Sequence, residues 1–206
     1  NCQIFKRYTE KHGQEAYSQD RVDRLVSTTD QQVSRLVRLV DDMLDISRIR
    51  TGKLSFTKEE INLSELLQEV LERLSPQFLE YKSGIPHVEL TESIRMMGDR
   101  LRIEQVISNL ISNALKYGRG NPIGVKLTKH NKIAKLSVSD QGIGIAPEFI
   151  DKVFLRFQRA VPASEVSGLG LGLYIAKQIV EAHDGTISLQ SKLNEGSTFS
   201  VEFPCY

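Results

Sequence analysis

A seven-residue repeat of apolar side chains is the first clear pattern along the chain, and it covers residues 22–50. Further apolar positions widen the repeat into a broad stripe, made of Val22, Leu25, Val26, Thr29, Val33, Leu36, Val37, Leu39, Val40, Met43, Leu44, Ile46 and Ser47. A stripe of this width is typical of a helix in a bundle rather than of a narrow two-stranded coiled coil. We therefore predict a helix that packs against partner helices; the alternative is one amphipathic helix packed on its own domain.

The residues on either side of the repeat define this first part of the chain. Residues 4–8 resemble the end of an earlier helix, before a polar stretch at residues 11–20. Thr51-Gly52-Lys53 is expected to end the long helix, because glycine is frequent just past the last helical turn. Residues 1–53 are thus predicted to be a partial helical hairpin of which only the second arm is complete.

Beyond residue 53 the pattern changes to a mixture of short strands and helices. Residues 54–57 alternate like a strand, and Asn62-Leu63-Ser64-Glu65 is similar to the capped start of a helix. We further predict helices at residues 99–117 and 169–183, and strands at residues 88–90, 123–129, 133–140, 186–191 and 198–203. Because strands and helices do not alternate strictly, as they do in a doubly wound sheet, residues 54–206 are predicted to form an α+β sandwich.

Composition narrows the classes of protein that remain. The 206 residues are 40% hydrophobic and 26% charged, as in a globular protein. The 27 basic and 26 acidic side chains leave a net charge of +1, whereas a nucleic-acid-binding surface needs a basic excess. There is no apolar run of about 18 residues and no secretory signal, so no membrane contact is expected. Cys2 and Cys205 have no metal-ligand spacing and form no disulfide framework, as expected in the cytoplasm.

The helix predicted at residues 99–117 has two different faces, if each residue turns it by roughly 100°. One face is an ordinary apolar core face, whereas the other carries amides and cations: Arg102, Gln105, Asn109, Asn113 and Lys116. Carboxamide oxygens can bind Mg²⁺ without adding charge, and a lysine can contact phosphate oxygens. A solvated surface is the alternative. Asparagine is a poor helix former on an exposed face, however, which favours a binding site.

Two glycine-containing segments are further candidates for a ligand site. Asp140-Gln141-Gly142-Ile143-Gly144-Ile145 directly follows a predicted strand. Glycines let the backbone approach a ligand closely, and the aspartate can accept a hydrogen bond from an amino group. A simple turn is the alternative for this segment.

The second segment, Gly168-Leu169-Gly170-Leu171-Gly172-Leu173, leads into an apolar helix. Glycines before a helix expose backbone N–H groups at its positive end, where phosphates bind. Close packing of the glycines is the alternative. The segment is neither a Rossmann fingerprint nor a P-loop, since no strand leads into it and no Gly-Lys-Ser/Thr follows. The small and polar residues 160–167, between the two glycine segments, predict a mobile lid.

In this order, the segments resemble the five boxes of the ATP-binding domain of histidine kinases, in the wider family of gyrase, Hsp90-type chaperones and MutL-type repair proteins. The boxes correspond to residues 109–117, 140–144, 154–159, 168–173 and 196–199. Residues 45–53 are similar to the end of the family's second dimerisation helix. The resemblance implies a two-layer α/β sandwich, with a mixed sheet and helices on one face, preceded by a helical-bundle dimerisation segment.

The resemblance also implies roles for individual residues toward ATP and Mg²⁺. Asp140 would bind the adenine amino group, supported by Thr198, and Asn113 would hold Mg²⁺ with Asn109 beside it. Lys116 and Tyr117 would contact the phosphates and the ribose. The backbone of the two glycine boxes would surround the nucleotide at Gly142, Gly144, Gly168, Leu169, Gly170, Leu171 and Gly172. Asn109, Lys116 and Arg159 are the catalytic candidates, with Arg159 on the γ-phosphate.

Two departures from the family pattern stand out. Asn194 occupies a position that is usually glycine in the last box, and asparagine tolerates the left-handed backbone that such a turn needs. The phosphoacceptor box of His, an acid and Arg-Thr-Pro-Leu is missing: none of His12, His87, His130 and His183 lies in that context. We expect that box on the first helix, upstream of Asn1.

The resemblance predicts an ATP-dependent protein histidine kinase that transfers the γ-phosphate to a histidine of the dimerisation helix, for relay to a response regulator receiver domain. Related ATPases carry a glutamate four residues before the Mg²⁺-binding asparagine, where it activates water. Here that position is Asn109, whose amide cannot take a proton, so transfer to protein is favoured over hydrolysis.

Three alternatives to the kinase remain: a noncatalytic ATP-binding regulator, an ATPase of the same superfamily, and an anti-sigma-type serine kinase, whose family lacks the helical hairpin. We expect a homodimer formed through the N-terminal helices. We also expect a cytoplasmic location, as a free protein or as the cytoplasmic part of a membrane-anchored sensor.

Overall fold

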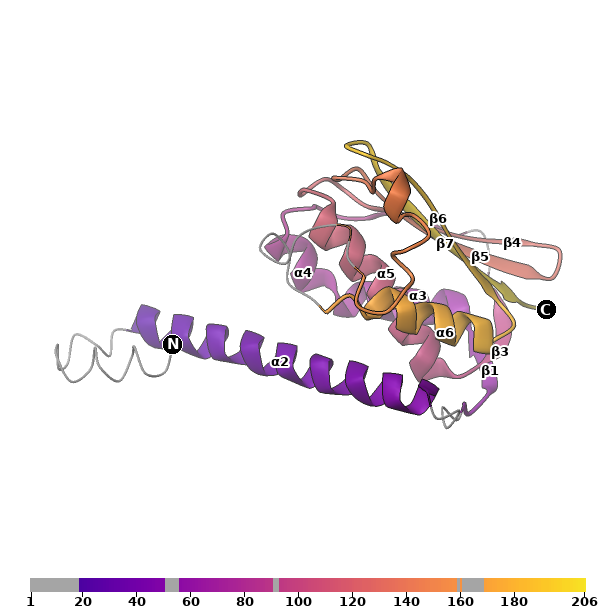
Figure 1. The fold of residues 1–206 in the computed structure, drawn as a ribbon, viewed down its shortest axis with the longest axis horizontal. Helices are drawn as coiled ribbons and strands as arrows, with labels where there is room; N and C mark the ends of the chain where they lie inside the picture. Colours follow the sequence, from indigo (N-terminus) through magenta and orange to yellow (C-terminus); the bar gives the residue numbers. More distant parts are fainter. Residues whose placement is uncertain (1–18, 51–55, 91–92, 159, 161–168) are drawn as a thin grey trace. The chain divides into compact units, whose positions relative to one another are not determined.

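The computed structural model describes residues 19–50, 56–90, 93–158, 160 and 169–206. The chain divides into two compact units, Asn1–Arg48 and Ile49–Tyr206. The first unit is described as one long helix, α2 (Gln19–Arg50), which Figure 1 shows in indigo. The expected first arm of the hairpin and the helix end at residues 51–53 lie outside the described residues.

The predicted apolar stripe of α2 is exposed to solvent over most of its length. More than half of the surface of Val26, Val33, Leu36, Val37, Val40 and Met43 is exposed, and nearly half of that of Leu44. Isolated helices gain little stability from their own hydrogen bonds, so most helices depend on the packing of an apolar face. An exposed apolar stripe of this length is the kind of surface that a partner helix covers.

The second unit is built on a five-stranded sheet with the strand order β2-β4-β5-β7-β6. The first pair of strands is parallel and the other pairs are antiparallel, so the sheet is mixed. The strands are β2 (His87–Leu90), β4 (Gly124–His130), β5 (Ile133–Asp140), β6 (Thr186–Lys192) and β7 (Gly196–Pro204). The sequence predicts all five strands of this sheet, and their bounds shift by at most two residues.

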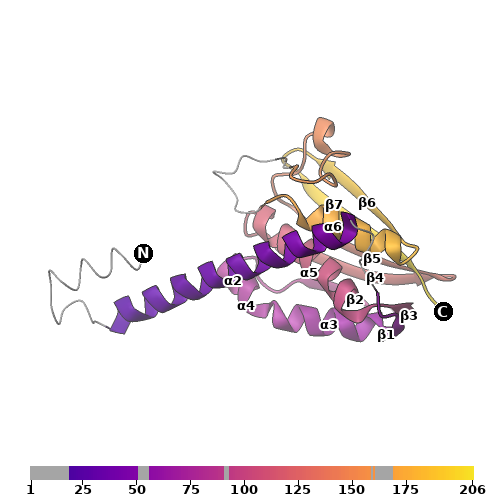
Figure 2. The ribbon, with the colours of Figure 1, turned by 60° about the horizontal axis from the view of Figure 1, so that its bottom comes forward.

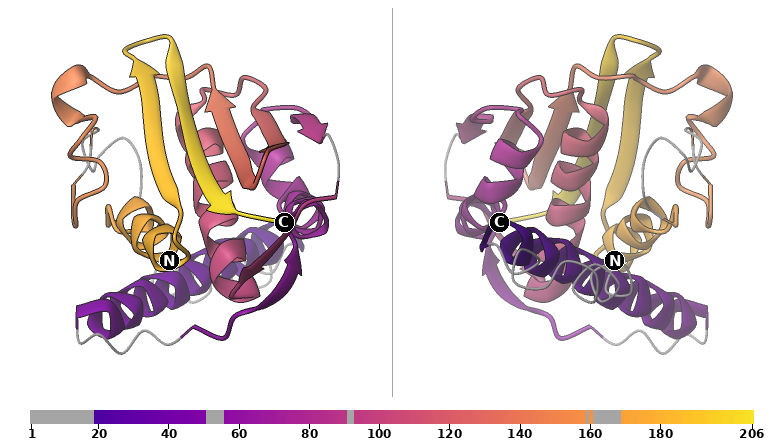
Figure 3. Two further views of the ribbon diagram at one scale, coloured as in Figure 1. Left: turned by 90° about the vertical axis from the view of Figure 1, so that its right-hand side faces the viewer. Right: turned by 90° about the vertical axis from the view of Figure 1, so that its left-hand side faces the viewer.

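Three helices gather on one side of this sheet, as Figures 1 and 3 show. They are α3 (Leu63–Arg73), α5 (Arg100–Tyr117) and α6 (Gly172–Ala182). Alternate strand residues point toward the helices and are buried, for example Leu136 and Val138 of β5, whereas their neighbours Lys135 and Ser137 point to the other face. This arrangement confirms the predicted two-layer α/β sandwich.

A small antiparallel sheet of β1 (Glu59–Asn62) and β3 (Arg95–Gly98) accompanies the main sheet. The prediction of a strand at residues 54–57 is wrong for Phe56 and Thr57, which precede β1; the other two residues are not described. The backbone N–H of Thr57 donates to Asp99 Oδ2 at 3.0 Å instead of joining a strand ladder. Strand β3 and the short helix α4 (Ser75–Glu80) were not predicted.

Side chains that cap the helices explain where two of them begin. The Asn62 side chain accepts hydrogen bonds from the backbone N–H groups of Ser64 and Glu65, which confirms the predicted start of α3. Asp99 likewise accepts from the N–H of Arg102 at the start of α5. Helix α6 begins three residues later than predicted, because Gly170 has a φ of +71°, which a right-handed helix cannot include.

A buried histidine joins the end of α6 to the start of α5. His183 Nε2 accepts from the backbone N–H of Asp99 at 2.9 Å, and His183 Nδ1 lies 2.7 Å from the carbonyl oxygen of Ile179. Because one partner is a donor and the other an acceptor, the ring must be neutral with its proton on Nδ1. The ring edge of Phe56 packs on His183, with centroids 5.2 Å apart. The imidazole therefore holds three distant segments together.

We expect replacement of His183 by phenylalanine to lower the free energy of unfolding by about 2 kcal/mol, because the N–H of Asp99 and the carbonyl of Ile179 would lose their partner.

Burial lowers the pKa of His183, and Lys58 acts in the same direction, whereas the Ile179 hydrogen bond, Asp99 and Asp184 oppose the shift. The folded chain then binds fewer protons than the unfolded chain, so stability falls as the pH drops below about 6.5.

Chemical denaturation at pH 5 and pH 7.5 tests this expectation. The loss of stability between the two pH values should be smaller in His183→Phe than in the unaltered chain. His130→Gln is the control, since His130 is exposed at the end of β4. An equal pH dependence in all three proteins would contradict the neutral, buried state of His183.

Candidate functional site

The two faces of α5 separate as the sequence predicts. Its apolar side chains are buried: Ile103, Val106, Ile107, Leu110, Ile111, Ala114 and Leu115. The amide and cation face is half-buried: Arg102, Gln105, Asn109, Asn113 and Lys116. A half-buried row of amides suits a ligand site better than a fully solvated surface, because buried amides need partners.

Asn109 connects this face of α5 to the first turn of α6. Its Nδ2 donates to the carbonyl oxygen of Gly172 at 3.2 Å. A Cβ atom at position 172 would lie 3.3 Å from Asn109 Oδ1, so the two helices approach closely here. Figures 1 and 2 show α5 and α6 side by side. With its nitrogen bonded to Gly172, the amide of Asn109 keeps Oδ1 as an acceptor.

Asp140 ends β5 on the side of the sheet that faces the helices, and only 7% of its surface is exposed. Its Oδ1 accepts from the backbone N–H of Gly142 at 2.8 Å, and the backbone of Ser197 also bonds to the carboxylate. Burial raises the pKa of Asp140, while these two backbone hydrogen bonds act in the opposite direction. Backbone N–H donors orient the carboxylate and leave its other lone pairs as hydrogen-bond acceptors.

The first glycine segment lies directly against the C-terminal end of α5. A Cβ atom on Gly142 would lie only 1.8 Å from the carbonyl oxygen of Tyr117, so no other residue fits there without a shift of the backbone. The backbone N–H of Ile143 donates to the same Tyr117 oxygen at 3.1 Å. This close approach brings Asp140 next to the helix end that carries Lys116 and Tyr117.

The second glycine segment leads to the start of α6. Among the described residues, no side chain caps this helix, whose N-cap residue is Leu171. The first backbone N–H groups of α6 therefore point out of a positive helix end with no side-chain acceptor in the described part of the chain. The structure describes four predicted site residues of this segment: Leu169, Gly170, Leu171 and Gly172. It does not describe the predicted site residues Gly168 and Arg159, or residues 161–167 of the predicted lid.

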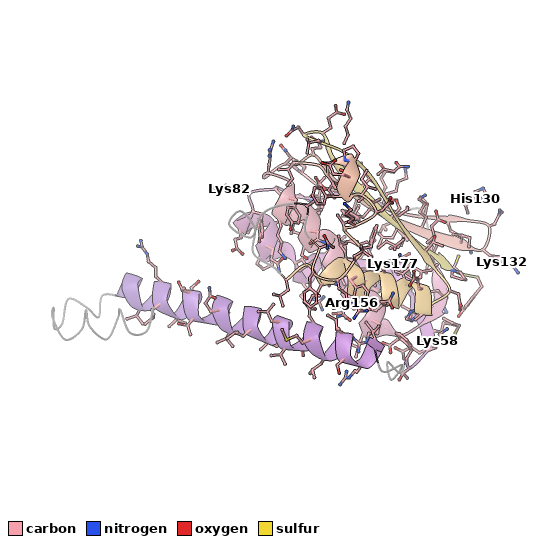
Figure 4. The ribbon with its side chains drawn as sticks, in the orientation of Figure 1. Lys58, Lys82, His130, Lys132, Arg156 and Lys177 are labelled. Atoms are coloured by element: carbon pink, nitrogen blue, oxygen red, sulfur yellow. The ribbon has the colours of Figure 1, made fainter. Side chains whose placement is uncertain are left out.

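Described residues of the third box (residues 154–159) pack on both α6 and the sheet. Phe154 contacts Phe199 edge to face, with ring centroids 6.4 Å apart. The Arg156 guanidinium lies 5.1 Å from the ring centroid of Tyr174, and Figure 4 labels Arg156 on the α6 side of the domain. The backbone N–H of Phe157 donates to the carbonyl of Gly170 at 3.1 Å. The described end of the third box is thus attached to the second glycine segment.

The strand register corrects the prediction for Thr198. Residue Asp140 pairs with Ser197, and Ser139 pairs with Thr198. Because successive strand residues point to opposite faces, Thr198 lies on the face away from Asp140, and it cannot support that carboxylate. Ser197 occupies the position instead and is buried, with 7% of its surface exposed. The sequence offered two adjacent hydroxyls, and only the pairing with β5 distinguishes them.

The turn before β7 keeps the backbone that the last box requires. Asn194 has a φ of +63°, which confirms the prediction that asparagine accepts a left-handed conformation here. Its N–H donates to the carbonyl oxygen of Ile143 at 2.7 Å. Gly196 follows with a φ of +106°, and a Cβ atom there would lie 2.0 Å from the carbonyl oxygen of Asp140. The turn and the first glycine segment therefore support each other.

Two other kinds of feature are absent from the part of the chain that the structure describes. No three or more His, Cys, Asp and Glu side chains come together there in a group that could hold a metal ion. None of the described helices combines the length and apolar character needed to cross a membrane.

Comparison with known proteins agrees with this geometry. Residues 98–206 match the family described as histidine kinase-, DNA gyrase B- and HSP90-like ATPase. The sensor histidine kinase WalK of Bacillus subtilis is 32% identical over 195 residues, which cover 91% of this chain and 31% of WalK. The sensor histidine kinase RppB of Synechocystis is 31% identical over 193 residues, or 90% of this chain and 41% of RppB. The chain thus spans less than half the length of these curated relatives.

Solved structures show the same similarity at the level of the fold. The histidine kinase AdeS of Acinetobacter baumannii has a TM-score of 0.73 and 26% identity, covering 98% of this chain and 94% of AdeS. The catalytic domain of the histidine kinase ThkA has a TM-score of 0.63 and 30% identity, covering 73% of this chain and 96% of that domain. The chain therefore belongs to the histidine kinase-, DNA gyrase B- and HSP90-like ATPase family, and its ATP-binding catalytic core is of the sensor histidine kinase type.

Proposed function

We propose that the chain binds ATP with Mg²⁺ and transfers the γ-phosphate to a histidine of a dimerisation helix, from which a response regulator receiver domain receives it. The observation that carries the proposal is the position of Asp140. Its carboxylate is buried, accepts from the backbone N–H groups of Gly142 and Ser197, and lies next to the C-terminal end of α5. A buried acceptor with fixed orientation suits the amino group of adenine.

Adenine would lie between Asp140 and the first glycine segment, with Ser197 beside the carboxylate. Gly142 lets this segment lie directly on the end of α5, where a Cβ atom would collide with the Tyr117 carbonyl oxygen. Gly144 has a φ of +63° and continues the same close-packed loop. Lys116 and Tyr117, at the end of α5, would contact the phosphates and the ribose.

The triphosphate would lie at the start of α6. The uncapped N–H groups of its first turn and the positive helix end suit a phosphate group. The backbone of Gly168, Leu169, Gly170, Leu171 and Gly172 would surround it. Asn113 would bind Mg²⁺ through its amide oxygen, with Asn109 Oδ1 nearby, and Arg159 would contact the γ-phosphate. Bound Mg²⁺ would neutralise part of the phosphate charge, which is the usual function of that ion in phosphoryl transfer.

Phosphoryl transfer to protein is favoured over hydrolysis by the chemistry of Asn109. An amide has no basic site that could take a proton from water. The amide of Asn109 is moreover engaged with Gly172 of α6, which suggests that it positions the second glycine segment. The alternatives are an ATPase of the same family and a noncatalytic ATP-binding regulator.

The long helix supports a homodimer in this proposal. The exposed stripe of α2 would pack in a bundle with its counterpart from a second chain, so residues 1–53 would belong to a dimerisation domain and residues 54–206 to the catalytic domain. The catalytic core would work in the cytoplasm, as a free protein or as the cytoplasmic part of a membrane-anchored sensor.

The test of this function is phosphoryl transfer in trans. We expect the chain, given labelled ATP and Mg²⁺, to place acid-labile label on a separately supplied helical hairpin that bears the phosphoacceptor box. We expect no label on the chain's own histidines. Of the three that the structure describes, His183 is buried with both ring nitrogens engaged, His87 contacts Glu89, and His130 lies at the exposed end of β4.

The outcomes separate the alternatives. Release of free phosphate without label on the hairpin would identify an ATPase. Binding of ATP without either product would identify a noncatalytic regulator. Label on His12, His87, His130 or His183 would show that an acceptor site lies within the chain and would contradict the expectation of a separate phosphoacceptor helix.

A further inference from the structure

A single hydroxyl on β6 connects three parts of the site around Asp140. Ser191 Oγ donates to the carbonyl oxygen of Gly196 at 2.9 Å and accepts from the backbone N–H of Ile145 at 2.8 Å. It also lies 3.0 Å from Ser197 Oγ. Ser191 thereby joins the first glycine segment, the turn before β7 and the hydroxyl next to Asp140.

The donor capacity of Ser191 decides the direction of the bond between the two hydroxyls. A serine hydroxyl has one proton and two lone pairs. The carbonyl of Gly196 can only accept, so the Ser191 proton is used there. The proton in the bond between Ser191 and Ser197 must therefore come from Ser197. Ser197 Oγ is left with lone pairs and no free proton.

The orientation of Ser197 matters because of what lies beside it. Ser197 and Asp140 are direct cross-strand partners on one face of the sheet, and each is 7% exposed. Side chains in such a pair have Cβ atoms about 5 Å apart, close enough to contact the same ligand group. The Asp140 carboxylate accepts from backbone donors. Both polar side chains at this position then present acceptors only.

We infer that Ser191 is a positioning residue that makes the site select a base with an amino group over a base with a carbonyl group at the same position. This inference rests on the proposed function, in which the base lies at Asp140. An amino group donates hydrogen bonds, so it can satisfy both acceptors. A carbonyl oxygen at that place would face Asp140 and Ser197 with no donor, and buried acceptors without a donor are strongly unfavourable.

The test compares the dissociation constants of ATP and ITP, which share the ribose and the triphosphate and differ only in the base. Inosine carries a carbonyl where adenosine carries the amino group, and a proton on the neighbouring ring nitrogen. Both differences are the same for every variant, so a change in the ratio between variants reports on the protein. In Ser191→Ala the proton of Ser197 is freed and can rotate to donate to that carbonyl. We expect the preference for ATP over ITP to fall about fivefold, the effect of one hydrogen bond. A general loosening of the site would weaken both nucleotides alike and leave the ratio unchanged.

Two further variants keep the test decisive if Ser191→Ala is unstable. Ser191→Thr retains the hydroxyl and should retain the preference. In a Ser197→Ala background, Ser191→Ala should not change the ratio any further, since the effect acts through Ser197. Ser137→Ala is the matched control, because it removes the bond between Ser137 Oγ and Ser200 Oγ, 2.8 Å apart on the opposite face of the same sheet.

The results distinguish failure of this inference from failure of the proposed function. If the chain does not bind ATP, or if Asp140→Asn does not weaken binding, the site itself is wrong. If Asp140→Asn weakens ATP binding and Ser191→Ala leaves the ratio of ATP to ITP affinity unchanged, the role of Ser191 is overturned while the site stands.

Discussion

Replacement of Asp140 by asparagine is expected to weaken ATP binding by about tenfold or more without lowering the stability of the fold. The loss of a hydrogen bond to a charged acceptor costs roughly 1.5–3 kcal/mol of binding free energy. Asparagine Oδ1 can still accept from the N–H of Gly142, so the local structure has no reason to collapse. Its NH₂ group would face the adenine amino group, where two donors meet without an acceptor.

The expected effect on stability follows from the pKa of Asp140. Burial raises this pKa above the ordinary value of 3.8, so the folded chain holds the proton more tightly than the unfolded chain. The free energy of unfolding therefore falls as the pH rises from about 3.8 through the folded pKa, and it stays at the lower level above that pH. Asparagine removes this loss, so Asp140→Asn should be at least as stable as the unaltered chain at pH 7.

Calorimetric titration with ATP and urea denaturation at pH 7 together measure both effects. Asp184→Asn is the control, because it removes the same charge from a side chain that is 82% exposed just past the end of α6. A mutant that is both unfolded and unable to bind would indicate a structural aspartate. A mutant with unchanged ATP affinity would count directly against the assignment of the adenine site.

Replacement of Asn113 by alanine is expected to abolish the Mg²⁺ dependence of nucleotide binding and to reduce phosphoryl transfer by on the order of a hundredfold. The residue lies on the half-buried amide face of α5, apart from the buried apolar face. Alanine is a better helix former than asparagine, so the helix itself should not be weakened. The loss would therefore arise from the missing metal ligand.

Titrations with ATP in the presence of Mg²⁺ or of a chelator measure this dependence. Ser108→Ala is the matched control on the same helix, since Ser108 Oγ accepts from Arg73 of α3 at 3.0 Å. The control should keep the Mg²⁺ dependence. If Asn113→Ala unfolds while Ser108→Ala does not, the asparagine face of α5 is structural and the metal assignment fails.

Local patterns allowed most of the elements around the site to be predicted. The apolar face and the amide face of α5 could be predicted from the helical period alone, and the structure has both faces. The start of α3 at Asn62 depends on side chains within three residues, so it too could be predicted. Asp140 at a strand end next to glycines was recognisable for the same reason.

Features that depend on contacts far apart in the sequence could not be predicted in this way. Strand β3 exists because it pairs with β1, more than thirty residues away. His183 bonds to Asp99 across 84 positions, and nothing near either residue indicates that bond. The error at Thr198 has the same origin. Ser197 and Thr198 are adjacent and both carry a hydroxyl group, and only the register with β5 determines which of them faces Asp140.

A structure of the chain with a non-hydrolysable ATP analogue and Mg²⁺ would show directly whether Asp140 binds the base. We expect the adenine amino group within hydrogen-bonding distance of Asp140, the phosphates at the first turn of α6, and the metal ion on the amide oxygen of Asn113. An analogue bound with its base away from Asp140, or no bound nucleotide at saturating concentration, would contradict this expectation.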